Sequence, residues 1–271
     1  MTISDWLRNT TKQLKDIGIN SNRLDAELIL AHTLRKPRTY LHAHLDDEID
    51  ERRYDIANAR LDLRLDRTPL AYIIGHKEFY GRSFIVTPSV LVPRPESESM
   101  IEWLLEITAN EISPKRLIDI GTGSGILGIT AKLERPHLEV TLTDIDAKAL
   151  TVARRNAELH EAAIHTRRDS LLDHQGFMVD YVLANLPYVD ASWDDTSAEL
   201  RHEPPHALYA TDGGLKLIAQ LIPQLARWLT PNGVALLEAD PTQHAQIRTV
   251  AEQHGLRSTG SRDYIVALTN S

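Results

Sequence analysis

The sequence of 271 residues contains no cysteine, and this absence removes several kinds of chemistry. The chain has no disulfides, no thiolate nucleophile and no Cys-ligated zinc or iron–sulfur cluster. It also has no apolar run long enough to cross a bilayer. Residues 1–6 have neither the basic region nor the apolar stretch of a secretory signal. We therefore expect a soluble, cytoplasmic protein that does not associate with membranes.

An excess of basic residues is also missing, since the formal net charge is -8 at pH 7. Residues 1–92 contain 14 basic and 13 acidic residues, whereas residues 93–271 contain 16 basic and 25 acidic ones. Proteins that bind nucleic acid usually present a basic face to the phosphate backbone. The acidic second part therefore favours a protein substrate, and we expect no stable nucleic-acid binding.

The pattern of apolar residues changes along the chain and predicts three parts. Residues 1–74 have apolar residues at helical spacing and should form a small all-α domain, with Ser4 as a helix N-cap. Residues 75–95 contain two short strand patterns that meet at Gly81 and are followed by prolines, so we expect a β-hairpin linker. Residues 96–271 should form the larger, catalytic domain.

Strand and helix patterns alternate in residues 96–271. The predicted strands are residues 116–120, 139–143, 179–184, 234–238, 256–261 and 264–269, with a short one before Asp169. Only a turn separates the last two strands, so they must be antiparallel neighbours. The predicted fold class is α/β, with a seven-stranded, mostly parallel, doubly wound sheet that ends in an antiparallel hairpin.

A glycine-rich turn follows the first predicted strand of this sheet. Asp119 and Ile120 lead directly into residues 121–125, Gly-Thr-Gly-Ser-Gly, and an apolar helix follows. Glycines let the backbone approach a ligand, and a helix N-terminus offers free amides to a carboxylate or a phosphate. Asp144 ends the second strand, where its carboxylate can accept hydrogen bonds from both ribose hydroxyls. Together these features predict a cofactor that carries an adenosine.

The register of the glycines distinguishes between possible cofactors. Gly123, Gly125 and Gly128 have the spacing of nicotinamide-binding enzymes, but in those enzymes the first glycine lies at the strand end, which here is Gly121. The register therefore makes NAD the less favoured alternative. The Asp-x-Gly-x-Gly-x-Gly pattern resembles the loop of class I methyltransferases, which implies a Rossmann-like fold and S-adenosylmethionine. The cofactor-binding residues implied are Asp119, Gly121, Thr122, Gly123, Ser124, Gly125, Asp144, Asp169, Ser170 and Asn185.

A second polar turn, Asn185-Leu186-Pro187-Tyr188, follows the fourth strand at the carboxyl edge of the sheet. An amide nitrogen is a poor nucleophile because its lone pair is delocalised into the carbonyl. The Asn185 side-chain oxygen and the Leu186 carbonyl can each accept one N–H and hold such a nitrogen for methyl transfer. Pro187 fixes the backbone, and Tyr188 offers a flat face. We expect all four residues to be catalytic and substrate-binding; an ordinary turn is the alternative.

With these motifs in place, residues 23–271 resemble the HemK-type release factor glutamine methyltransferases. In that family a helical domain, which binds the release factor, and a hairpin linker precede the methyltransferase domain. The linker ends in Pro-Arg-Pro-acid-Thr-Glu, here residues 93–98, and residues 203–208 match a further segment. The resemblance implies methylation of the side-chain nitrogen N5 of the glutamine in the Gly-Gly-Gln loop of class 1 peptide chain release factors. Arg94 and Glu98 are expected to help close the cofactor pocket; a rigid connector is the alternative for residues 93–98.

Two positions depart from the family pattern. Leu186 replaces the first proline of the usual Asn-Pro-Pro-Tyr turn, which keeps the carbonyl but removes rigidity, and Ser170 stands where an aromatic residue often covers the adenine. Asn-Leu-Pro-Tyr also resembles the turn of the ribosomal RNA adenine dimethyltransferases. A ribosomal-protein glutamine methyltransferase, an adenine-N6 nucleic-acid methyltransferase and an inactive scaffold that binds release factors therefore stay open as alternatives.

Residues 202–206, His-Glu-Pro-Pro-His, match the zinc-protease pattern H-E-x-x-H by letter. That motif needs an uninterrupted helix to bring both histidines to one face, and two adjacent prolines break such a helix. We therefore expect no metal site in this segment.

Overall fold

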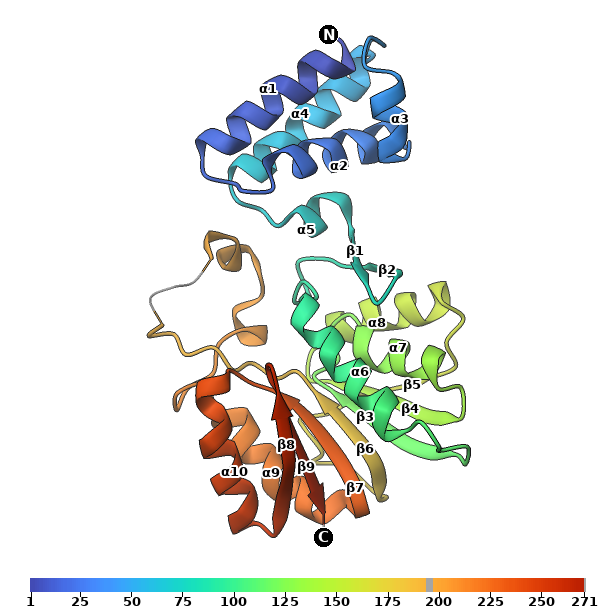
Figure 1. Cartoon of the computed structure of the whole chain (residues 1–271), viewed down its shortest axis with the longest axis vertical. Helices are drawn as coiled ribbons and strands as arrows, with labels where there is room; N and C mark the ends of the chain where they lie inside the picture. Colours follow the sequence, from blue (N-terminus) through green and yellow to red (C-terminus); the bar gives the residue numbers. More distant parts are fainter. Residues whose placement is uncertain (194–196, 271) are drawn as a thin grey trace. The chain divides into compact units, whose positions relative to one another are not determined.

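The structure, a computed structural model, describes residues 1–193 and 197–270. Two compact units divide the chain, and Figure 1 labels their elements. The first unit is Met1–His76 with Ser197–His202, and the second is Lys77–Thr196 with Glu203–Ser271. In the described part of the chain, no helix combines the length and apolar character needed to cross a bilayer.

The first unit is helical, as the apolar spacing predicts. Its helices are α1 (Ile3–Asp16), α2 (Asn22–Leu34), α3 (Arg38–Ala43), α4 (Glu51–Leu65) and α5 (Leu70–Ile74). Their apolar faces enclose a core that includes Ile3 and Trp6. The prediction of Ser4 as an N-cap was wrong: burial of Ile3 extends α1, and the Thr2 hydroxyl caps it by accepting the Asp5 N–H.

Ser197–His202, which contains the 3₁₀ helix η2 (Ala198–His202), belongs to this helical unit. The pattern of the sequence alone placed the segment in the larger domain. Oε1 of Glu199 lies 3.2 Å from Nη1 of the buried Arg64 and 3.6 Å from Nη1 of Arg67. The segment is therefore held by ion pairs with the end of α4 and the residues that follow it.

A two-stranded sheet of β1 (His76–Phe79) and β2 (Arg82–Ile85) confirms the predicted hairpin, and all of it except His76 belongs to the second unit. Seven strands in the described residues form the large sheet: β3 (Lys115–Ile120), β4 (Leu138–Asp144), β5 (His165–Arg168), β6 (Val179–Ala184), β7 (Leu229–Glu238), β8 (Leu256–Arg262) and β9 (Ile265–Asn270). The helical elements of this unit are η1 (Pro95–Ser97), α6 (Glu98–Ile107), α7 (Ile126–Glu134), α8 (Ala147–Leu159), η3 (Pro205–Ala207), α9 (Lys216–Trp228), η4 (Pro241–Gln243) and α10 (His244–Gln253).

The strand order is β5-β4-β3-β6-β7-β9-β8, and β9 runs antiparallel to both of its neighbours. This topology confirms the predicted parallel sheet with an antiparallel C-terminal hairpin. The chain order reverses between β3 and β6, and ligands of such sheets bind at the carboxyl ends of the strands beside that point. Ile120 pairs with Ala184, and Ala184 pairs with Leu237, so the residues that follow these three meet at one edge.

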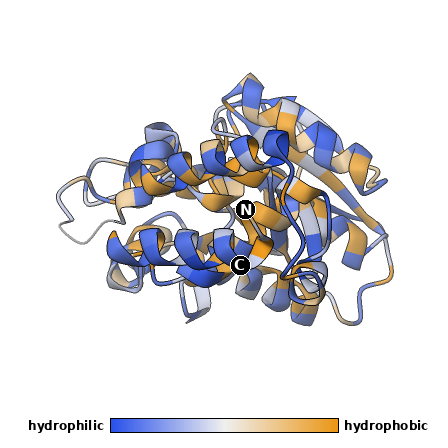
Figure 2. Ribbon diagram, turned by 90° about the horizontal axis from the view of Figure 1, so that it is seen from above, coloured by the Kyte–Doolittle hydropathy of each residue, from blue (hydrophilic) through white to orange (hydrophobic). Residues whose placement is uncertain are grey.

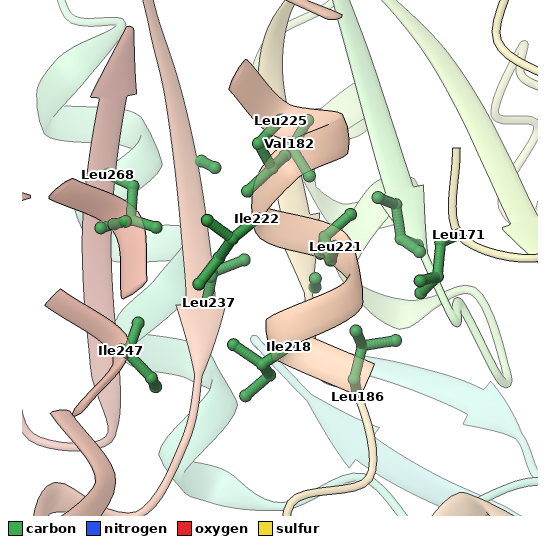
Figure 3. Packing of buried hydrophobic residues seen from close by; sticks show 14 of the residues in the cluster. Leu171, Val182, Leu186, Ile218, Leu221, Ile222, Leu225, Leu237, Ile247 and Leu268 are labelled. Atoms are coloured by element: carbon green, nitrogen blue, oxygen red, sulfur yellow. The ribbon is translucent and has the colours of Figure 1, made fainter. Parts of the chain in front are cut away.

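Two apolar clusters cover the two faces of the sheet. Helices α9 and α10 lie over one face, and α6, α7 and α8 lie over the other (Figure 1). Figure 2 shows hydrophilic and hydrophobic residues mixed along the helix ribbons, as expected when one side of each helix is buried. Leu186 belongs to the first cluster with Ile218 and Leu221 of α9 (Figure 3), so the apolar core extends up to the predicted catalytic turn.

Candidate active site at the carboxyl edge of the sheet

The loop between β3 and α7 has a backbone that favours glycine. The φ angles of Gly121, Gly123 and Gly125 are 65°, 54° and 85°, values that residues with a side chain rarely adopt. A Cβ atom on Gly128 would lie 2.2 Å from Cδ2 of Leu142, so α7 packs closely on β4 only with glycine there. The loop therefore depends on its glycines for both its conformation and its support.

Asp119 supports the loop from behind. Its side chain is buried, and its Oδ2 accepts hydrogen bonds from the Thr122 hydroxyl at 2.5 Å and from the Gly128 N–H at 2.9 Å. Burial raises the pKa of Asp119 to about 6, although both donors oppose the rise. Asp119 is thus in position to shape the loop rather than to line the hollow in front of it.

Asp144 lies at the end of β4, where the sequence analysis placed a ribose-binding carboxylate. Its Oδ2 accepts the Gly123 N–H at 3.0 Å, and its Oδ1 accepts the Asp146 N–H at 2.9 Å. Burial raises the pKa of this carboxyl group. Each oxygen retains accepting capacity beyond its one backbone donor, so the carboxylate is oriented and can still receive two hydroxyl hydrogens.

A hollow of about 760 Å³, part of it open solvent, lies in front of this loop. Its lining residues are Ser89, Val90, Leu91, Pro93, Arg94, Ser97, Gly121, Thr122, Gly123, Ser124, Ile126, Leu127, Asp144, Ile145, Ala149, Asn185, His206 and Ala207. The hollow therefore brings together the glycine loop, Asp144, Asn185 and Arg94, which the sequence analysis had named from four separate segments.

Other predicted residues lie outside this lining. Asp169 directs Oδ1 toward the Ser170 N–H at 2.9 Å and toward Nδ1 of His174 at 2.8 Å. Oε1 of Glu98 accepts the Tyr80 N–H at 2.9 Å, so this side chain joins α6 to the hairpin. The roles of Asp169, Ser170 and Glu98 at the cofactor stay predictions.

An apolar wall of the hollow was not predicted from the sequence. Ile145 follows Asp144 directly, lines the hollow and is nevertheless 60% exposed. An apolar side chain beside a ribose-binding carboxylate suits the flat face of a purine. A hydrophobic residue immediately after a strand-ending acid is the signal that sequence reading can use to find such a wall.

The predicted catalytic turn is joined to two side chains that are distant in sequence. Nδ2 of Asn185 donates to Oγ of Ser97 at 3.1 Å, and Oγ of Ser97 donates to Oε2 of Glu238 at 2.5 Å. The Tyr188 hydroxyl donates to Oε1 of the same carboxylate at 3.2 Å. Burial raises the pKa of Glu238, and hydrogen bonds from Ser97, Tyr188 and Asn185 oppose that rise. Ser97 and Glu238 were not predicted from the sequence as part of the site.

The backbone of the turn is held by its surroundings. Leu186 is buried, and a Cβ on Gly121 would lie 3.0 Å from its Cδ2, so the leucine fills the space between the two loops. Nε2 of Gln243 donates to the Tyr188 carbonyl at 2.9 Å. Within residues 1–193 and 197–270, no donor reaches Oδ1 of Asn185 or the carbonyl oxygen of Leu186. Both oxygens therefore keep their accepting capacity, and Asn185 lines the hollow.

Glu203 has a structural partner rather than a metal-binding geometry. It is buried and accepts the Val92 N–H at 2.9 Å together with a hydrogen bond from the Arg94 guanidinium. His202 ends η2, whereas His206 lies in η3, so the two histidines do not share one continuous helix. Glu203 thereby connects the segment that carries His206 to the linker residue Arg94 at the hollow.

Two known protein domains match the chain. A model of the PrmC N-terminal domain matches residues 5–75, and a model of the methyltransferase small domain matches residues 99–236. The release factor glutamine methyltransferase of Koribacter versatilis is 37% identical, over 89% of this chain and 89% of its own. The chain belongs to the release factor glutamine methyltransferase family. The family member of Coxiella burnetii is 33% identical over 99% of this chain and 97% of its own.

Solved structures agree with this family at the level of the fold. The T. thermophilus 16S rRNA N2 G1207 methyltransferase, in complex with AdoMet and guanosine, matches 72% of this chain and 49% of its own with a TM-score of 0.56 and 16% identity. The hMettl16 catalytic domain matches 85% of this chain and 84% of its own, with a TM-score of 0.55 and 15% identity. The methyltransferase fold predicted from the glycine loop is thus confirmed.

Proposed function

We propose that this family member transfers a methyl group from S-adenosylmethionine to the side-chain nitrogen N5 of the glutamine in the Gly-Gly-Gln loop of class 1 peptide chain release factors. The curated relatives that match nearly their whole length are named release factor glutamine methyltransferases. One structural observation carries the proposal: the pairing of Ile120 with Ala184 sets the glycine loop beside Asn185, whose Oδ1 is free.

The residues of the hollow fit S-adenosylmethionine, which supplies a methyl group on a positively charged sulfur when it is bound. The amides at the start of α7 suit its carboxylate, because a helix N-terminus favours anions. Asp144 is assigned to the ribose hydroxyls and Ile145 to the adenine. The cofactor contacts include residues 121–124 and Asn185, which all line the hollow.

The turn after β6 fits a primary amide. Oδ1 of Asn185 and the Leu186 carbonyl each accept one N–H of the glutamine side chain, which fixes the orientation of its nitrogen. The same two oxygens stabilise the positive charge that develops on this nitrogen during transfer. Pro187 keeps the turn rigid, and the ring of Tyr188 offers a flat surface. No base is required before transfer, because the surplus proton leaves the nitrogen afterwards.

The direct test combines the purified protein, labelled S-adenosylmethionine and purified release factors, followed by mass spectrometry of the product. We expect one label, on the glutamine of the Gly-Gly-Gln loop. A release factor in which alanine replaces that glutamine is the matched control and should stay unlabelled. Label on a ribosomal-protein glutamine or on a nucleic acid, with none on the release factors, would contradict the proposed substrate.

The proposed partner is therefore a protein that acts in translation termination, and we place the enzyme in the cytoplasm for that reason. The acidic balance of residues 93–271 supports a protein substrate over a nucleic acid. Weak or absent retention of the protein on nucleic acid at physiological salt is the corresponding prediction.

A further inference from the structure

A buried carboxylate stands behind the acceptor turn. Glu238 ends β7, and the pairing of Ala184 with Leu237 places it beside Asn185. Only 1% of Glu238 is exposed. In the described residues it forms no ion pair, and hydroxyl groups donate to both of its oxygens. Burial of a carboxylate is unfavourable unless its oxygens accept hydrogen bonds or pair with a cation. Here hydroxyl donors take the place of a cation.

The direction of each hydrogen bond follows from the chemistry of the carboxylate. Both hydroxyl groups are directed at this carboxyl group, because Ser97 donates to Oε2 and Tyr188 donates to Oε1. The lone pairs of Ser97 Oγ then remain to accept a hydrogen from Nδ2 of Asn185, at 3.1 Å. With its nitrogen held in this way, the Asn185 amide presents its oxygen to the hollow.

We propose that Glu238 is a positioning residue, which acts through Ser97 to keep Oδ1 of Asn185 directed at the acceptor substrate. The inference rests on the proposed function, because an acceptor oxygen is useful only to a substrate that carries N–H groups. In the reversed orientation, Nδ2 of Asn185 would meet the N–H of the substrate amide, and two donors form no hydrogen bond. The reversed amide would also lack the oxygen that stabilises the developing positive charge.

The discriminating variant is Glu238→Gln, which keeps the shape of the side chain. A glutamine can donate an N–H to Ser97, which frees the Ser97 hydroxyl to donate to Oδ1 of Asn185 and favours the reversed amide. We expect kcat for release factor methylation to fall by roughly tenfold to a hundredfold, the scale of a misplaced reacting group. The dissociation constant for S-adenosylmethionine should change by less than about twofold, since Glu238 does not line the hollow.

Four further variants separate positioning from a merely structural role. Glu102→Gln removes an exposed carboxylate of α6 that has no contact with Glu238 or Asn185, and it should leave kcat unchanged. Ser97→Thr keeps the bridging hydroxyl and should retain most of the activity, whereas Ser97→Ala should lose it. The double variant Ser97→Ala with Glu238→Gln should be no slower than the slower single variant, because both changes interrupt one chain of hydrogen bonds.

The outcomes are distinct. Wild-type kcat in Glu238→Gln would overturn the inference, and so would additive losses in the double variant. A Glu238→Gln protein that loses thermal stability and cofactor affinity along with activity would assign the residue a structural role instead. Failure of the wild-type protein to methylate any release factor would refute the proposed function. That result is obtained before the variants are compared, so it is distinct from failure of the inference.

Discussion

The carboxyl edge of the sheet is built differently in its two halves. Beside β3 and β4, the cofactor half orients its ligand groups with backbone amides, as when the Gly123 N–H fixes Asp144. Beside β6 and β7, the acceptor half relies on side chains, in the series Asn185, Ser97 and Glu238. A backbone amide cannot reverse its polarity, whereas a hydroxyl or a side-chain amide can. The cofactor half therefore depends on conformation and packing, and the acceptor half depends on the direction of its hydrogens.

The largest expected effect isolates the acceptor half. Replacing Asn185 by alanine removes one of the two free acceptors, and kcat should fall by about a hundredfold to a thousandfold, as with other positioned groups that stabilise developing charge. Affinity for S-adenosylmethionine should stay within a few fold, because the residue acts mainly on the nucleophile. Single-turnover kinetics and calorimetry measure the two quantities. Equal losses in both would show that the two halves are not separable at this residue.

The converse change isolates the cofactor half. Asp144→Ala should weaken S-adenosylmethionine binding by about 1–3 kcal/mol, the scale of hydrogen bonds to a charged group. Asp146→Asn is the matched control: it removes the neighbouring negative charge but keeps an oxygen to cap α8, where Asp146 accepts the Lys148 N–H. Calorimetry should find the control close to wild type. An unchanged dissociation constant in Asp144→Ala would remove the ribose assignment.

A third change tests the packing beneath the cofactor loop. Gly128→Ala places a methyl group where Leu142 and Asp119 now lie, so the free energy of unfolding should fall by about 1–3 kcal/mol, as in other overpacked cores. Gly176→Ala is the control, because no atom of the described residues lies within 4 Å of the added Cβ. Urea unfolding compares the two variants. Equal stabilities would show that the helix can move away from the strand without penalty.

The smallest effect concerns the carboxyl group behind the loop. The pKa of Asp119 is about 6 in the folded protein against an ordinary value of 3.8, so the folded state binds a proton more tightly than the unfolded state. The resulting stability is complete below pH 4 and is lost as the pH rises through 6. Between pH 5 and pH 7 the wild type should lose about 1 kcal/mol relative to Asp119→Asn. Parallel stability curves for the two proteins would contradict this assignment.

The sequence predicted the cofactor half well because its parts are contiguous or end neighbouring strands. The spacing of Gly121, Gly123 and Gly125 can be recognised without knowledge of the fold. The acceptor half was predicted only at Asn185 and its turn. Ser97 lies 88 residues from Asn185 along the chain, and only the strand register brings Glu238 to the same place. An acid at the end of a buried strand was recognised as functional at 144 and overlooked at 238.

Local patterns were also sufficient for most of the fold. The bounds of β6 agree with the predicted strand, whereas β7 begins at Leu229, five residues before the predicted Val234, because alternation is interrupted by Pro231 and Gly233. The position of residues 197–202 could not be predicted. It depends on charges at Arg64 and Arg67, more than 100 residues earlier, and no periodicity within the segment indicates such partners.

That segment makes the helical unit discontinuous in the gene. A fragment that stops after His76 would contain Arg64 and Arg67 but not Glu199. It would therefore lack the carboxylate that forms ion pairs with these two arginines. Exchange of the first 76 codons between two such genes would likewise combine the helices of one protein with residues 197–202 of the other. Only inheritance of both stretches together keeps Glu199 with its arginine partners.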